Sequence, residues 1–75
     1  MSNKRAITII KDVIEENEKY KEHLYDLSDE NRNSRRNSQL VEEEELRLFS
    51  QRENVDIAIK SLIHSLKILE GYENE

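Results

Sequence analysis

Hydrophobic residues recur with a seven-residue period in the first third of this 75-residue chain. With the seven positions labelled a to g, the stripe consists of Asn3, Ile10, Asn17 and Leu24 at a, Ala6, Val13, Tyr20 and Leu27 at d, and Ile7 and Ile14 at e. A stripe of this width is typical of an amphipathic helix that packs against another helix. The pattern predicts a first helix over about residues 3–27.

The same period returns after a polar gap. Its members are Val41, Leu48, Val55, Leu62 and Leu69 at d, Glu45, Arg52, Ile59 and Leu66 at a, and Phe49 and Ile63 at e. Ser38 is expected to cap this helix, and Gly71 is expected to end it as a left-handed residue after the last turn. The pattern predicts a second helix over about residues 38–70, with a short tail at 71–75.

Residues 28–38 carry no hydrophobic side chain, and their serines and asparagines favour turns. We expect them to form the loop between two antiparallel helices. Two alternatives are a segment that is helical in part and one continuous helical rod, because the segment also lacks Gly and Pro. The sequence therefore predicts an all-α fold, an antiparallel and coiled-coil-like two-helix hairpin, as a single domain over residues 1–75.

Folding the chain back about this loop gives a register in which the numbers of facing positions sum to about 68. Val13 then faces Val55, and Asn17 faces Arg52. A polar layer of this kind would fix the register of the two helices. The alternative is that Arg52 extends to solvent and the pairing has no role.

The second helix holds more apolar residues than one seam can bury. Leu46, Ile57 and Ile68 lie outside the seam at a spacing of eleven residues, which returns to nearly the same side of a helix. We expect a second copy to cover this side and form a homodimeric four-helix bundle. A different protein partner, or scattered surface residues without a partner, are the alternatives. The expected interface consists of Leu46, Phe49, Ile57, Ser61, His64 and Ile68, with Ile9 from the first helix.

Composition and the lack of known motifs reduce the number of functions to consider. Charged residues make up 39% of the chain and the net charge is −5, which disfavours binding to nucleic acid. The absence of Cys excludes thiol catalysis and fits a reducing compartment, so a cytoplasmic location is expected. No apolar run is long enough to cross a membrane. Neither His23 nor His64 follows a Glu at the third preceding position, and no phosphate-binding glycine loop is present, so we expect no enzyme activity, metal or cofactor.

Three arginines, Arg32, Arg35 and Arg36, lie in the predicted loop of an otherwise acidic chain. Such a group can bind a carboxylate cluster or a phosphate of a partner. The simpler interpretation is a solvated loop in which the arginines neutralise Asp29 and Glu30.

The sequence thus predicts a small non-enzymatic helical protein that acts by protein–protein interaction, as a regulator or adaptor from a bacterium or phage. The first alternative is an acidic inhibitor of a host nucleic-acid-processing protein, by analogy with small acidic proteins from AT-rich genomes and their phages. The second rests on Ser38-Gln39-Leu40-Val41-Glu42, which resembles the Ser-Gln-Glu-Leu-Asp motif of the short two-helix aspartyl-phosphate phosphatases of sporulating bacteria. That resemblance implies dephosphorylation of a response regulator, although the leucine and the acidic residue stand out of step with the motif.

Overall fold

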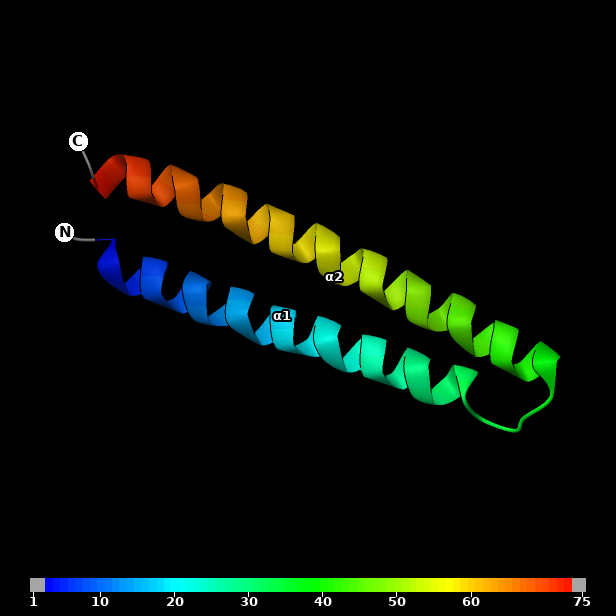
Figure 1. Cartoon of the computed structure of the whole chain (residues 1–75). Coiled ribbons are helices and arrows are strands. Elements are labelled where there is room, and N and C mark those ends of the chain that lie inside the picture. Colours follow the sequence, from blue (N-terminus) through cyan, green and yellow to red (C-terminus); the bar gives the residue numbers. More distant parts are fainter. Residues whose placement is uncertain (1–2, 74–75) are drawn as a thin grey trace.

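The computed structural model describes residues 3–73 as two antiparallel helices, α1 (Lys4–Arg32) and α2 (Ser38–Glu73), joined by residues 33–37 (Figure 1). The hairpin is a rod with principal extents of 57 × 14 × 12 Å. The start of α1 and the end of α2 lie at one end of the rod and the loop at the other (Figure 1). The predicted all-α antiparallel hairpin is confirmed, and the alternative of one continuous helix is excluded.

The first helix ends five residues later than predicted, at Arg32 in place of residue 27, because polar contacts continue the packing where the apolar stripe stops. Ser28 and Asn31 are buried against α2. The Ser28 hydroxyl donates to the Glu45 carboxylate at 2.7 Å, and the Asn31 amide donates to the Val41 carbonyl at 3.0 Å. The predicted loop over 28–38 is therefore wrong for residues 28–32, which are helical.

Both ends of α2 also differ from the prediction. Asn37 is the cap in place of Ser38, because its side-chain oxygen accepts the Gln39 N–H at 2.8 Å and Ser38 is already helical. At the other end α2 continues through Gly71 to Glu73, and no glycine among residues 3–73 has a positive φ. Glycine permits a left-handed conformation without requiring it. The predicted helix end and tail are thus wrong for residues 71–73, and residues 74–75 lie outside the described part of the chain.

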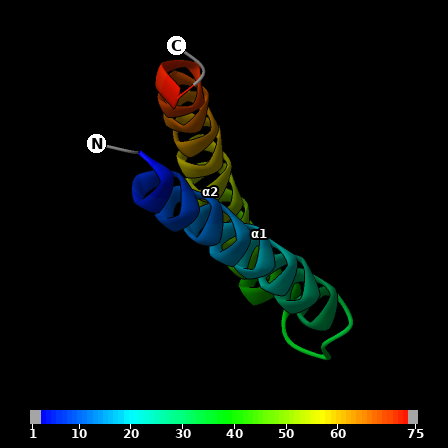
Figure 2. The same cartoon turned by 90° about the vertical axis from the view of Figure 1, so that its left-hand side faces the viewer.

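The core lies in the middle and loop-side part of the hairpin. It consists of the buried residues Leu24, Leu48, Val55 and Ile59, with Ile14 and Leu27 packed against them. The two helices are inclined to each other, so that the start of α1 and the end of α2 diverge (Figure 2). The apolar side chains there are only half-buried, namely Ile7, Ile10, Leu62, Leu66 and Leu69. The hairpin therefore holds a short, thin core, with weaker packing at its open end.

The seam uses the predicted face of α2 but a rotated face of α1. Leu48, Val55 and Ile59 point at α1 as predicted. On α1, Val13 and Tyr20 at position d are exposed, whereas Ser28, in register with position e, is buried. α1 has thus turned toward its a and e positions. Its d residues Val13 and Tyr20 contribute to the surface, whereas Leu27 at d still packs against the core.

The register of the two helices also differs from the predicted one. The predicted register places residue 40 opposite Ser28, and the structure places Glu45 there. Asn31 contacts Val41, where residue 37 was expected. The shift is about one helical turn along α2. It follows from the longer α1 and the shorter loop, and it displaces the predicted pairs, including Val13 with Val55.

Candidate interaction site

The two most exposed large apolar residues of the described chain, Leu46 and Ile57, lie on the side of α2 that faces away from α1. Leu46, Ile57 and Ile68 form what we call the outer line, and they are 69%, 61% and 48% exposed. Leu46 is two residues from the fully buried Leu48, which is about 200° around a helix. The outer line is therefore opposite the seam, and the apolar side predicted from the spacing of eleven is present and uncovered.

Polar residues separate the members of the outer line. Glu53, Lys60, Ser61 and His64 are all exposed on α2. Glu53 forms no side-chain hydrogen bond or ion pair within residues 3–73. The outer line is thus a mixed surface about 33 Å long from Leu46 to Ile68, with charged groups available to a partner.

Phe49 and Ile9, the other apolar residues expected at the interface, are also exposed but lie elsewhere. Ile9 is exposed on α1, whereas the outer line is on the side of α2 that faces away from α1. Phe49 is on the flank of α2 that borders α1, where it contacts Arg52. The structure therefore does not gather all seven expected interface residues on one surface.

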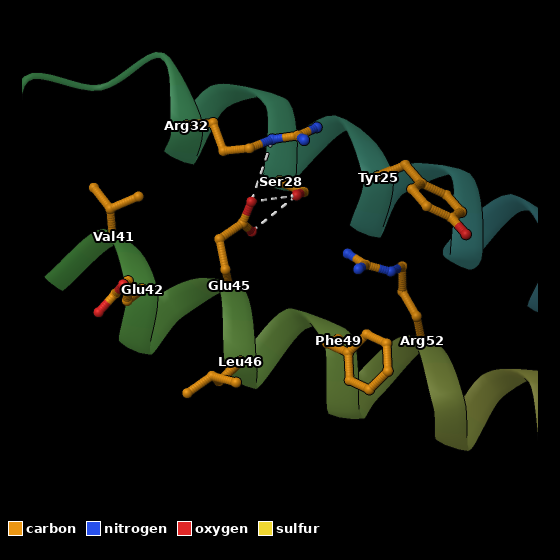
Figure 3. Close-up of a pocket in the computed structure, with 9 residues that line it drawn as sticks. All are labelled: Tyr25, Ser28, Arg32, Val41, Glu42, Glu45, Leu46, Phe49 and Arg52. Atoms are coloured by element: carbon orange, nitrogen blue, oxygen red, sulfur yellow. Dashed lines mark hydrogen bonds and ion pairs between the residues drawn. The ribbon is translucent and has the colours of Figure 1, made fainter. Parts of the chain in front are cut away.

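That flank forms an open groove of about 660 Å³ near the loop (Figure 3). Its lining consists of Tyr25, Ser28 and Arg32 from α1 and Val41, Glu42, Glu45, Leu46, Phe49 and Arg52 from α2. The sequence did not indicate this groove, because it depends on the rotation of α1 and on the register. The only signal in the sequence is Tyr25, an aromatic residue that lies outside the predicted seam.

At the inner wall of the groove, Glu45 joins the two helices. One of its carboxylate oxygens accepts the Ser28 hydroxyl at 2.7 Å and the other at 2.8 Å, and Arg32 approaches the first at 3.3 Å (Figure 3). Each partner of the carboxylate comes from α1. This cluster satisfies the buried Ser28 and fixes the register next to the loop.

The predicted polar layer of Asn17 and Arg52 was wrong. The Asn17 amide donates to the Val13 carbonyl in its own helix at 2.8 Å. The guanidinium carbon of Arg52 lies 4.8 Å from the centroid of the Tyr25 ring and 5.9 Å from the centroid of the Phe49 ring. One guanidinium nitrogen of Arg52 is buried without a hydrogen-bond acceptor. Arg52 thus packs as a cation between two aromatic rings.

The three arginines predicted in the loop do not form one cluster. Arg32 is the last residue of α1 and pairs with Asp29 at 2.6 Å as well as with Glu45. Arg35 and Arg36 lie in the loop and are exposed. The structure therefore leaves two arginines at the tip.

Two further ion pairs shift pKa values on the surface. Hydrogen bonding to Lys21 holds the pKa of Asp56 below its usual value, and the pKa of Lys21 is raised in turn. Hydrogen bonding to Arg47 likewise lowers the pKa of Glu44. The pair of Lys21 and Asp56 joins α1 to α2, so it adds to the register that Glu45 sets.

The acidic run at the start of α2 does not form a convergent site. Glu44 is engaged by Arg47, and Glu45 by Ser28 and Arg32. Within the described residues no three His, Asp or Glu side chains gather in a way that could hold a metal ion. Neither described helix is long and apolar enough to cross a membrane.

The stretch that resembles the phosphatase motif opens α2. Ser38 is its first residue, and the Gln39 side chain donates to Glu43 at 3.4 Å. Both residues are exposed. No family model, curated protein or solved structure matches the chain.

Proposed function

We propose that this protein acts without catalysis, by binding another protein through the outer line of α2, and that its first partner is a second copy of itself. The observation that carries the proposal is the exposure of Leu46 and Ile57, which leaves more than half of each side chain in water. Burial of such side chains is the main favourable term in protein association.

The thin core supports this proposal. Only four hydrophobic residues are buried among the described residues of the hairpin. Chains of this size usually need a disulfide, a metal or association to reach ordinary stability, and this sequence contains no Cys. A partner on the outer line would give α2 a second packed side.

The position of the outer line also defines the shape of the assembly. Because the line is opposite α1, a second copy on it places the two α2 helices together at the centre, with an α1 helix on each outer side. The four helices then form a layer. A square bundle, in which every helix contacts two others, would instead use the flank that carries Tyr25 and Phe49.

Light scattering on a sizing column tests the proposal with the full chain. We expect wild type to be dimeric at high concentration, Ile57→Asp to be monomeric, and Thr8→Asp to remain dimeric. Thr8 is exposed on α1 and controls for the added charge alone. Circular dichroism of Ile57→Asp verifies that the variant is still helical. A wild-type chain that is monomeric at every concentration contradicts self-association.

A further inference from the structure

We infer that the second copy binds antiparallel along α2, with the two-fold axis passing between the two copies of Ile57. This inference rests on the proposed self-association and specifies its geometry. It concerns only the outer line and the polar residues between its members. Figure 1 shows that no other part of the described chain covers that side of α2.

The spacing of the outer line is symmetric about Ile57. Leu46 precedes it by eleven residues and Ile68 follows it by eleven. When a second α2 runs in the opposite direction, Leu46 lies level with Ile68 of the second copy, and Ile57 lies level with itself. An isologous dimer needs a surface that is complementary to itself in this way. The eleven-residue repeat keeps the line nearly straight, so the contact can extend over its whole length.

The charges between these residues distinguish the two possible directions. Glu53 precedes Ile57 by four residues and Lys60 follows it by three, on the same side of the line. The antiparallel alignment brings Glu53 of each copy beside Lys60 of the other, so the dimer contains two such pairs. In a parallel dimer the two-fold axis runs along the helices, so Glu53 and Lys60 of one copy lie at the opposite edge of the contact from those of the second copy and neither pair forms. The charge pairs therefore favour the antiparallel arrangement.

The positions of Ser50 and His64 also favour the antiparallel direction. His64 and Ser50 each lie seven residues from Ile57, on opposite sides of it in the sequence, and both are exposed. The antiparallel alignment therefore places His64 beside Ser50 of the second copy. A parallel dimer would instead bring the two His64 side chains together.

Single cysteines test the direction, because the chain has no Cys of its own. Packed helices have axes about 8–10 Å apart and Cα atoms about 2.3 Å from each axis, so facing Cα atoms lie within disulfide range. Under mild oxidation we expect Ile57→Cys to cross-link with itself. Leu46→Cys and Ile68→Cys should not cross-link alone, but a mixture of these two should. Thr8→Cys measures cross-linking by random collision.

Charge reversal gives a second test that leaves the apolar residues intact. Glu53→Lys and Lys60→Glu should each weaken self-association about tenfold, because each converts two attractive pairs into repulsive ones. A mixture of the two variants restores both pairs and should form heterodimers as strong as the wild-type dimer. Glu22→Lys, on an exposed position of α1, is the matched control and should behave as wild type.

The outcomes separate this inference from the proposed function. If wild type is dimeric but Leu46→Cys and Ile68→Cys each cross-link alone, the copies are parallel and the inference is overturned while self-association stands. Unchanged dimerisation of Glu53→Lys would overturn it equally. A wild-type chain that stays monomeric refutes the proposed function and this inference together.

Discussion

Leu48→Ala and Leu46→Ala truncate the same kind of side chain at positions two residues apart on α2. The structure predicts a large loss of stability for the first and a small one for the second. Leu48 is 0% exposed and belongs to the core with Leu24 and Val55, whereas Leu46 is the most exposed large hydrophobic residue of the outer line. The pair therefore measures burial by α1 separately from burial by a partner.

The expected cost of Leu48→Ala follows from its environment. Truncation of a buried leucine costs about 3–5 kcal/mol, from lost transfer free energy and from the cavity left behind. With only two helices around it, the site can relax and partly fill with water, so we expect about 3 kcal/mol. A chain of this length has a total stability of about 4–11 kcal/mol, so the change removes a large part of it. The midpoint of thermal unfolding should fall by about 12–24 °C.

Leu46→Ala should cost less than about 0.5 kcal/mol in the isolated hairpin, because that side chain is already in water. If a second copy covers the outer line, the same variant should lose the concentration dependence of the wild-type melting temperature. Urea and thermal unfolding followed by circular dichroism, at low and high protein concentration, measure both effects. Equal losses for the two variants at low concentration, or a loss below about 1 kcal/mol for Leu48→Ala, would refute this description of the core.

Three further predictions follow from single contacts. Because Lys21 lowers the pKa of Asp56, the stability from that pair is present above the usual carboxyl pKa of 3.8 and is lost as pH falls through the lowered value. The melting temperatures of wild type and Asp56→Asn should therefore converge in acid, and a constant difference at every pH would contradict the role of the pair. Gly71→Ala should raise stability by up to about 1 kcal/mol, because Gly71 is helical and an added Cβ meets nothing there; destabilisation would show instead that the helix ends at a left-handed glycine. Arg52→Met keeps the packing between the two aromatic rings and removes the nitrogen without an acceptor, so chemical unfolding should show unchanged or higher stability, and a loss above about 1 kcal/mol would indicate an unrecognised partner.

The hydrophobic pattern determined α2 better than α1, for a physical reason. On α2 the apolar positions are crowded enough that Leu48, Val55 and Ile59 define a single best side toward α1. On α1 the polar residues Ser28 and Asn31 are part of the buried surface, and no hydrophobic pattern can include them. The hydrophobic pattern therefore failed to predict the end of α1 and its rotation for the same reason.

The outer line was predictable, since a spacing of eleven residues is a property of the sequence alone. The groove beside it was not, because Tyr25 and Arg52 come together only through the actual register. Arg52 shows the difference clearly. From its heptad position it was expected to face Asn17, but it lies beside a tyrosine two turns further along α1.

The sequence by itself determined two antiparallel helices, the side of α2 that faces α1, and a second apolar side with no place in a hairpin. These features depend on residue spacing within one helix, which the geometry of the helix makes readable. The tertiary structure decided the length and rotation of α1, the register, and the partners of Glu45 and Arg52. Those features depend on side-chain hydrogen bonds and ring contacts between two helices, and each side chain can make them only after the other helix is in place.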